Sequence, residues 1–381
     1  MKFYLLSIRE INMWYKIIPK DTLFFRDGKP FTMGSETWGE TIFPPYPSTV
    51  YGAVRSWLIF ERGSLKDFLD GKFEEDLGTK NKKGALSIKG PFLMTDELNF
   101  VPPLDLVIIK DKENTKDKDK LYPLYLLNKP EIFISDYPLE NILIWQKREQ
   151  VEEAEGYMTL IYLKTYLKGE DSIRILRQKE FFIHEPKIGI AREKLTCTAK
   201  EAHLYRVPMI RLKNEVSILI KIEGVKNIPQ EGIIQLGGEG KTAKIQKIID
   251  LTMGIENTMG IENIDIDISN GMFKIYFATP SIFENGWLPK WIDTKTFKGE
   301  YKGINLQLIG ACIGEYKLIG GWDIANNNPK PMRKAIPAGS VYYFRILDNI
   351  NIEKIMEAFH FKNISDIFPE EGFGLALIGV V

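Results

Sequence analysis

A chain of 381 residues exceeds the size to which one hydrophobic core usually grows, so two domains are expected. Its 44% hydrophobic and 27% charged residues are typical of a soluble globular protein. Because Lys plus Arg and Asp plus Glu both total 51, the chain does not bind nucleic acid through bulk charge, although a local basic surface stays open.

The first predicted element is a strand over residues 14–25, where aromatic and β-branched side chains dominate. It ends at a turn signal, Asp27-Gly28, which is flanked by Arg26 and Lys29. These two cations are either solvated turn charges or a two-pronged clamp for a phosphate, and the turn alone leaves both interpretations open.

A helix is predicted over residues 49–60, with Ser48 as its N-cap after a proline-rich approach. Helical spacing predicts a buried face made of Val50, Ala53, Val54, Trp57 and Leu58. Because a helix start offers unpaired amides and a partial positive charge, Ser48, Thr49 and Arg55 could together hold a backbone phosphate. An ordinary capped helix is the alternative.

Residues 64–180 are interpreted as insertions. The run 111–120 alternates in charge without an apolar residue and predicts a solvated loop, whereas 146–168 has the apolar spacing of a helix. Two apolar clusters, 121–127 and 142–145, form either a patch that faces a partner or a satellite core beneath the loops.

A basic stretch over residues 186–213 includes Arg192 and predicts a protruding hairpin or loop that leads into a strand at 203–212. The next strand, 215–223, is predicted from the alternation of its apolar residues. A short connection over 224–235 then leads to the first of two glycine clusters.

The first glycine cluster covers residues 236–241. Dense glycines permit positive φ and allow a ligand to approach the backbone amides, which then form an anion-binding concavity. Gly237, Gly238, Gly240 and Lys241 are therefore candidate phosphate ligands. The Walker-A spacing is not met, which excludes a P-loop. A tight helix-to-strand connection without a ligand is the alternative.

The second half follows a tandem duplication, 253–258 and 259–264, which predicts an exposed linker over 253–270. Its predicted elements are strands at 273–278 and 340–346, a helix at 352–359, and the second glycine cluster, Gly372 and Gly374, before a final strand.

Strand, helix and a glycine loop entering a strand occur in both halves. The predicted fold class is therefore α+β, with two ferredoxin-like (RRM-like, βαββαβ) domains. The first domain covers residues 1–252, with its insertions at about 64–180, and the second covers 271–381.

Few residues offer catalytic or metal-binding chemistry. His184, His203 and His360 have no paired metal-ligand spacing, and His360 is expected to be structural. Asp265 and Asp267 could share one strand face and hold magnesium, but a solvated face is the favoured interpretation. We therefore predict a binding protein that is not an enzyme and uses no metal or cofactor.

Cys197 and Cys312 are the only cysteines and lie far apart, which is typical of a reduced, cytoplasmic setting. No apolar run is long enough to span a bilayer, and residues 1–8 are too short for an export signal. We expect a cytoplasmic protein without membrane contact.

Seven motifs make the chain resemble the RAMP superfamily of RNA-binding CRISPR proteins. More narrowly, it is similar to the type III-B (Cmr) effector-complex subunit that grips the 5′ tag of the guide RNA. Each motif is weak alone, but all occur in the family's order at 25–31, 47–56, 189–192 with 204–205, 236–240, 319–323, 335–341 and 372–377. Residues 1–12 and 111–120 lie outside the resemblance.

The resemblance implies two RRM-like domains, binding of guide RNA (crRNA), and contacts with the large polymerase-like subunit and the backbone RAMP subunit. Carried over residue by residue, it implies RNA contacts at Arg26, the Ser48-Thr49 helix start with Arg55, Arg192 and the two glycine loops.

The resemblance also bears on catalysis. Some relatives cleave RNA with a histidine, and this chain has none in or beside its glycine loops, so a non-catalytic subunit is favoured. The alternative is a metal-independent endoribonuclease that processes guide RNA, with Tyr205 or Lys241 supplying an acid–base group.

Overall fold

The computed structural model describes residues 13–26, 41–110, 119–130, 135–193, 196, 198–248, 260–262, 264–268, 270–323, 328–349 and 351–381. The chain divides into two compact units. Unit 1 draws on residues 1–95, 179–249 and 318–333, and unit 2 on residues 96–178, 250–317 and 334–381. Most of the stretch interpreted as insertions in the first half therefore lies in unit 2.

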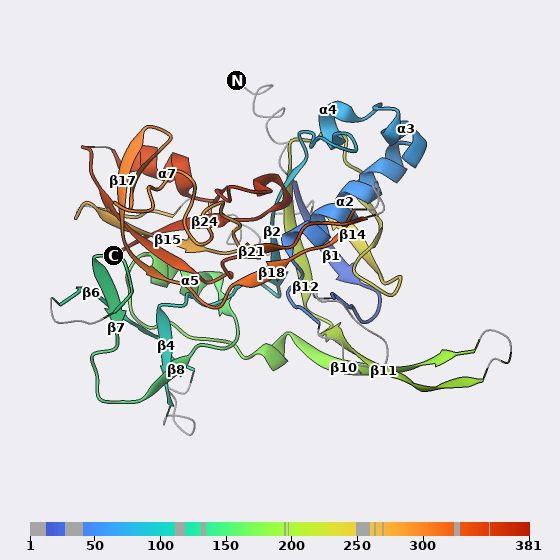
Figure 1. Cartoon of the computed structure of the whole chain (residues 1–381), viewed down its shortest axis with the longest axis horizontal. Helices are drawn as coiled ribbons and strands as arrows, with labels where there is room; N and C mark the ends of the chain where they lie inside the picture. Colours follow the sequence, from blue (N-terminus) through green and yellow to red (C-terminus); the bar gives the residue numbers. More distant parts are fainter. Residues whose placement is uncertain are drawn as a thin grey trace. The chain divides into compact units, whose positions relative to one another are not determined.

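Unit 1 contains a sheet with the strand order β13-β14-β1-β12-β2, in which neighbouring strands are antiparallel (Figure 1). Its elements are β1 (Met13–Pro19), α2 (Pro47–Arg62), α3 (Leu65–Leu69), α4 (Glu74–Leu77), β2 (Ser87–Met94), β10 (Phe182–Arg192), β11 (Ala199–Leu212), β12 (Ser217–Glu223), β13 (Glu231–Gln235), β14 (Thr242–Lys247), β19 (Trp322–Asp323) and β20 (Asn328–Pro329).

Helix α2 packs on this sheet through the apolar stripe that its sequence predicts. Val50, Val54, Trp57 and Leu58 are buried, whereas Ala53 is only half-buried. The Trp57 ring meets Tyr15 of β1 edge-on, with 6.1 Å between centroids. Burying each large apolar side chain stabilises the fold by about 1.5–3 kcal/mol, so this stripe fixes the helix on the sheet.

The predicted strand 14–25 is interrupted. β1 ends at Pro19, whose ring removes the amide that would continue a ladder. Further along, Leu23 exchanges two backbone hydrogen bonds with Ile210 of β11, at 2.7 and 2.8 Å. The two pieces therefore pair with different strands.

The predicted second helix of the first βαββαβ domain is absent. Residues 224–241 are all described and contain β13 and turns, so the interpretation of 224–235 as a mere connection was wrong. The strand predicted at 215–223 is confirmed as β12, and its residues from Ser217 to Ile222 are buried on both faces.

Unit 2 contains a second sheet, with the order β16-β17-β22-β15-β24-β23. Its elements are β3 (Leu98–Phe100), β4 (Leu106–Ile109), β5 (Tyr122–Pro123), β6 (Tyr125–Asn128), β7 (Asn141–Ile144), β8 (Val151–Glu153), β9 (Met158–Thr159), α5 (Leu160–Leu167), β15 (Met272–Phe277), β16 (Lys298–Tyr301), β17 (Ile304–Cys312), β22 (Val341–Ile346), α7 (Ile352–Phe359), β23 (Lys362–Asn363), η3 (Pro369–Glu371) and β24 (Leu375–Val380).

Three short elements lie where the chain passes from one unit to the other: η2 (Gln178–Glu180), β18 (Lys317–Ile319) and β21 (Arg333–Ala335). Strands β18 and β21 pair with each other as a two-stranded ribbon.

The core of unit 2 is aromatic. Phe359 of α7 packs against Phe273 of β15 and against Tyr301 of β16, with centroids 6.0 and 4.7 Å apart. The strands and helix predicted for the second half are thereby confirmed as β15, β22, α7 and β24. A helix between the first two strands is absent, because residues 278–297 are all described and contain only turns and isolated bridges.

The helix predicted over residues 146–168 was largely wrong. Only Leu160–Leu167 is helical, and the preceding residues form β8 and β9. Gly156 has φ +143°, and a Cβ there would lie 2.2 Å from the carbonyl oxygen of Leu176. This close backbone passage is incompatible with a helix, although the apolar spacing suggested one.

The apolar clusters of the insertions contribute to a satellite core. Leu121 and Ile142 are buried. The hydroxyl of Tyr137 accepts a hydrogen bond from the Ala311 amide at 2.9 Å and lies 3.2 Å from the Ala311 carbonyl, which ties this region to β17. Burial in unit 2 is therefore shown for Leu121 and Ile142, whereas Tyr125 of the first cluster is 39% exposed.

Among the described residues, no helix combines the length and the apolar character needed to cross a membrane.

Candidate nucleic-acid interface

The first glycine cluster is the turn of a β-hairpin rather than a helix-to-strand connection. Gln235 of β13 pairs with Thr242 of β14, and the Lys241 amide donates to the Gly238 carbonyl at 3.3 Å. The two central residues, Glu239 and Gly240, have φ +58° and +63°. Positive φ at both central positions is the mark of a type I′ turn, which suits the twist of a hairpin.

This turn packs against the chain that follows β1. The Gly238 amide donates to the Phe24 carbonyl at 2.8 Å. A Cβ at Gly237 would lie only 2.4 Å from the same oxygen, so this position requires glycine for close packing. Gly237 and Gly238 are thus accounted for by contacts inside unit 1.

The tip of the turn is open. Glu239 and Gly240 are exposed, and a Cβ at Gly240 would meet no atom within 4 Å. No described residue accepts a hydrogen bond from the amide of Glu239 or Gly240. Among the described residues, these two neighbouring amides in left-handed backbone therefore lack an acceptor, and amides in such a turn suit an anion.

Lys241 has partners within unit 1. Its Nζ lies 2.9 Å from Asp21 Oδ2 and 2.9 Å from Thr22 Oγ1. The Asp21 carboxylate is also 3.1 Å from Nη2 of Arg211, and Arg211 in turn pairs with Glu185. The hydrogen bond from Lys241 is the main cause that lowers the pKa of Asp21 to about 2. Lys241 therefore orders the turn and is not an isolated phosphate-binding charge.

Arg26 lies at the end of the segment on which the glycine turn packs. It is exposed and forms a backbone bridge with Thr41, and the Ile42 amide donates to the Phe25 carbonyl at 2.8 Å. The other cation predicted for this clamp, Lys29, lies outside the described residues.

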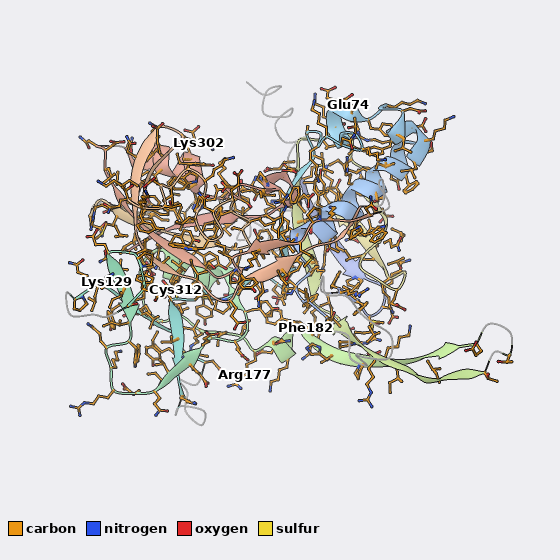
Figure 2. The ribbon with its side chains drawn as sticks, in the orientation of Figure 1. Glu74, Lys129, Arg177, Phe182, Lys302 and Cys312 are labelled. Carbon is orange, nitrogen blue, oxygen red and sulfur yellow. The ribbon has the colours of Figure 1, made fainter. Side chains whose placement is uncertain are left out.

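The start of α2 is close to the same segment. Phe43 stacks edge-on against Phe182 with centroids 4.6 Å apart, and its centroid lies 6.2 Å from that of Phe25. Phe182 begins β10 and is labelled in Figure 2. The structure therefore brings the 41–46 approach to α2, residues 24–26 and the base of the β10–β11 hairpin together.

Ser48 is not the N-cap of this helix. α2 begins at Pro47, and Tyr46 is the capping residue with extended backbone and no side-chain capping bond. Proline is favoured at the first helical position because its missing amide would be unpaired there in any case. Ser48 and Thr49 therefore lie within the first turn and are half-buried, and the Thr49 amide donates to the Tyr46 carbonyl at 3.0 Å.

Arg55 binds backbone carbonyls inside unit 1, a role that was not predicted from the sequence. Its Nε donates to the Leu77 carbonyl at 2.8 Å and its Nη2 donates to the Thr79 carbonyl at 2.9 Å. The guanidinium also lies 4.9 Å from the centroid of the Phe68 ring. These contacts hold α3 and α4 against α2 and direct Arg55 away from a phosphate at the helix start.

The basic stretch is a long two-stranded ribbon, which confirms the predicted hairpin. β10 and β11 pair from Phe182 with Leu212 out to Arg192 with Ala199. Figure 1 shows this ribbon running out from the rest of unit 1. Its base is held by Phe24, Val207 and Met209, which form a buried cluster. Arg192 therefore lies near the outer end of the ribbon.

The second glycine cluster is buried. Gly372 and Gly374 both have positive φ, but the Gly374 amide donates to the Pro280 carbonyl at 2.8 Å. The Leu375 amide donates to Thr279 Oγ1, and the same hydroxyl donates to the Gly372 carbonyl. Packing inside unit 2 accounts for these glycines, and their amides are not open to RNA.

Catalytic and metal chemistry is sparse. No group of three or more His, Cys, Asp and Glu suited to a metal occurs in the described part of the chain, and Asp265 and Asp267 are exposed outside any strand. His360 is structural, as predicted: its Nδ1 accepts from the Ile378 amide and its Nε2 lies 2.7 Å from the Ile261 carbonyl. Burial lowers the pKa of His360, which favours the neutral ring.

Comparison with known proteins identifies the family. The model of the family described as CRISPR-associated protein (Cas_Cmr3) matches residues 15–381. This chain belongs to the Cmr3 family of CRISPR-associated proteins. The resemblance to a Cmr subunit is thereby confirmed at the level of the family.

A member of this family from Saccharolobus solfataricus, the CRISPR system CMR subunit Cmr3, is 24% identical over 342 residues, which is 88% of each chain. A chain in a cryo-EM structure of the type III-B Cmr-beta bound to cognate target RNA is 19% identical, with TM-score 0.47 and coverage of 87% of this chain and 86% of the other. A chain of a type III-A Csm3–Csm4 subcomplex is 12% identical, with TM-score 0.36 and coverage of 90% and 95%.

The partners that order the site in this Cmr3-family chain were missed by the sequence analysis. Asp21 is 220 residues from Lys241, and Glu185 is 26 residues from Arg211. The only local signal was a carboxylate, Asp21, within a predicted strand, and such a residue is ordinary on a protein surface. Of the predicted residues, the structure places Arg26, the α2 start, Gly237, Gly238, Gly240 and Lys241 in unit 1, and Gly372 and Gly374 in unit 2.

Proposed function

We propose that this chain is a non-catalytic RNA-binding subunit of a type III-B CRISPR ribonucleoprotein. In this proposal it holds the 5′ tag of the guide RNA and bridges to the large subunit. The observation that carries the proposal is the open tip of the glycine turn, with the two amides of Glu239 and Gly240, in a Cmr3-family chain. A phosphate of the RNA backbone would supply the acceptor that the described residues do not provide.

The interface that we propose is smaller than the one expected from the sequence. It comprises the tip of the glycine turn, Arg26, the start of α2 with Ser48 and Thr49, and the β10–β11 ribbon with Arg192. Lys29 remains a proposed contact. Arg55, Gly372 and Gly374 are left out because their polar groups are engaged inside the chain.

We also propose that both sheets are ferredoxin-like units that each lack one helix. β14-β1-β12-β2 in unit 1 and β17-β22-β15-β24 in unit 2 support this proposal, since each places the first and third strands in the middle. The proposed partners are the large polymerase-like subunit and the backbone RAMP subunit, in the cytoplasm.

No observation favours the alternative of a guide-RNA processing endoribonuclease. Lys241, one of the two candidate acid–base groups, is held by Asp21 and Thr22. Contacts inside unit 1 therefore engage the side chain of Lys241.

The test replaces Gly240 by alanine and uses Gly71→Ala as the matched control. Both glycines lie in unit 1 with positive φ, and a Cβ at either meets no atom within 4 Å. Each substitution is expected to cost about 1 kcal/mol of stability, since left-handed backbone disfavours a Cβ. Only Gly240→Ala places a methyl group where RNA would approach, so only this variant should lose affinity, by about 10-fold (about 1.4 kcal/mol).

Affinity for a labelled single-stranded RNA that begins with the 5′ tag is measured by fluorescence anisotropy, and stability by thermal unfolding. Equal RNA affinity in Gly240→Ala and Gly71→Ala, at equal stability, would contradict a role for the turn in binding RNA.

A further inference from the structure

Trp322 in unit 1 is exposed to an extent that packing does not explain. It is 56% exposed, whereas the other described tryptophans are buried or half-buried. It lies on β19 and pairs directly with Pro329 of β20, so both side chains are on the same face of a two-residue ribbon. A tryptophan normally contributes by burying a large apolar area, and this ring buries less than half of its surface in the chain.

The two residues before Trp322 are glycines, and Gly321 is exposed. The Lys330 amide donates to the Gly321 carbonyl at 2.8 Å. A Cβ at Gly321 would lie 3.7 Å from Cδ of Lys330, so the lysine stem runs beside this glycine. The residue that precedes the exposed ring is thus a glycine with a lysine stem beside it, and neither of the two preceding positions carries a bulky side chain.

The local charge differs from that of the whole chain. Residues 317–334 contain four cations, Lys317, Lys330, Arg333 and Lys334, and a single acid, Asp323. The whole chain contains 51 of each sign. The sequence segment that contains the β19–β20 ribbon is thus locally basic in an otherwise neutral chain, and local positive charge attracts the phosphate backbone of a nucleic acid.

We infer that Trp322 is a stacking platform for an unpaired base of single-stranded RNA. The inference rests on the proposed function, because the RNA is taken to be the guide that the glycine turn of the same unit holds. Aromatic rings that alternate with cations are the usual means of binding single strands, since every base has a face to stack on and every nucleotide has a phosphate.

A partner protein is the other class of ligand for an exposed tryptophan. The composition disfavours it, because lysine is depleted in protein–protein interfaces whereas three of the four cations in residues 317–334 are lysines. The ring therefore fits a nucleobase better than a protein pocket.

The experiment compares Trp322→Ala and Trp322→Phe in the full-length chain, alone and in its purified assembly. The probe is a labelled single-stranded RNA oligonucleotide that begins with the 5′ tag. Loss of one stacked base is expected to weaken binding by about 5- to 100-fold for the alanine variant, whereas the phenylalanine variant keeps most of the affinity. Phe60→Ala is the matched control, because Phe60 is 65% exposed on α2 of the same unit and has no proposed RNA contact.

Abasic RNAs locate the stacked base. If Trp322 stacks on one base, a single abasic position weakens binding to the wild-type chain but has little further effect on Trp322→Ala, as a double-mutant cycle requires. Additive losses at every position would overturn the inference.

The outcomes separate this inference from the proposed function. If Gly240→Ala weakens RNA binding and Trp322→Ala does not, only the stacking platform is wrong. If neither variant weakens RNA binding, the proposed function fails. If the Trp322→Ala chain no longer joins the assembly but binds RNA with unchanged affinity, the ring contacts a protein partner. This outcome also overturns the inference.

Discussion

At the scale of single residues, the charged groups inside unit 2 illustrate how burial sets protonation. Asp105 is 1% exposed, and its carboxylate accepts hydrogen bonds from the hydroxyls of Tyr166 and Tyr343. Nζ of Lys274 lies 3.5 Å from the centroid of the Tyr166 ring. Burial lowers the pKa of Lys274 to about 8, although the charge of Asp105 opposes this shift. Holding the ammonium charged therefore costs stability at neutral pH.

Replacing Lys274 by methionine tests this cost. Because the folded pKa of about 8 is below the unfolded value of about 10.4, the unfolded chain binds more protons between these pH values. Stability of the wild-type chain should therefore rise with pH in this window, by a total on the order of 3 kcal/mol. Lys274→Met should lack that rise. Denaturant unfolding between about pH 7 and 11 measures this rise, and parallel curves for the two chains would contradict the assignment.

At the scale of elements, Arg55 joins three helices of unit 1. α3 and α4 are short, and helices of this length are marginal without tertiary contacts. Arg55 of α2 supplies two charged hydrogen bonds to carbonyls at and after the end of α4. Favourable contacts between a cation and helix C-terminal carbonyls also follow from the helix dipole.

Arg55→Ala should consequently lower the free energy of unfolding by about 1.5–3 kcal/mol, the usual range for hydrogen bonds from a charged group. RNA affinity should stay unchanged. Arg55→Lys is the control that keeps the charge but lacks the planar fork, and it should recover only part of the stability. Thermal unfolding and RNA anisotropy give the two readouts. Weaker RNA binding at unchanged stability would return Arg55 to the RNA interface.

At the scale of the whole molecule, charge balance limits how RNA can be held. The formal net charge is zero, and three described cations in or beside the glycine turn are paired with carboxylates: Lys241 with Asp21, Arg211 with Glu185 and Lys187 with Glu239. Exposed pairs of this kind contribute little to stability, but they reduce the positive potential that an RNA would meet. The chain should therefore bind RNA through a small number of phosphates.

The salt dependence of RNA affinity reports the number of phosphate contacts. For single strands, log K falls with log salt by about 0.7 per phosphate contact, so a few contacts predict a slope of roughly −2 to −3. Titrations of the full-length chain with tag RNA at several salt concentrations provide the slope. A slope steeper than about −6 is typical of a strongly basic protein. It would show that the interface includes many more cations than those of the glycine turn, Arg26, the β10–β11 ribbon and residues 317–334.

Local pattern by itself determined α2, β12, β15 and α7, because a period of 3.6 or 2 in the apolar residues is a property of adjacent positions. The same pattern failed at 146–168, where close passage of Leu176 past Gly156 decides the backbone. It also could not show that the short connection expected over 224–235, before the first glycine cluster, contains β13.

The sequence located the glycine turn and the cations of the candidate site, and the seven motifs identified the family. Only the tertiary structure decided which of these groups are open. Lys241 is engaged by Asp21 and Arg55 by α4, whereas Glu239 and Gly240 are exposed and their amides lack an acceptor among the described residues. Whether a polar group is available depends on partners that lie far away along the chain, and folding alone brings them within hydrogen-bonding distance.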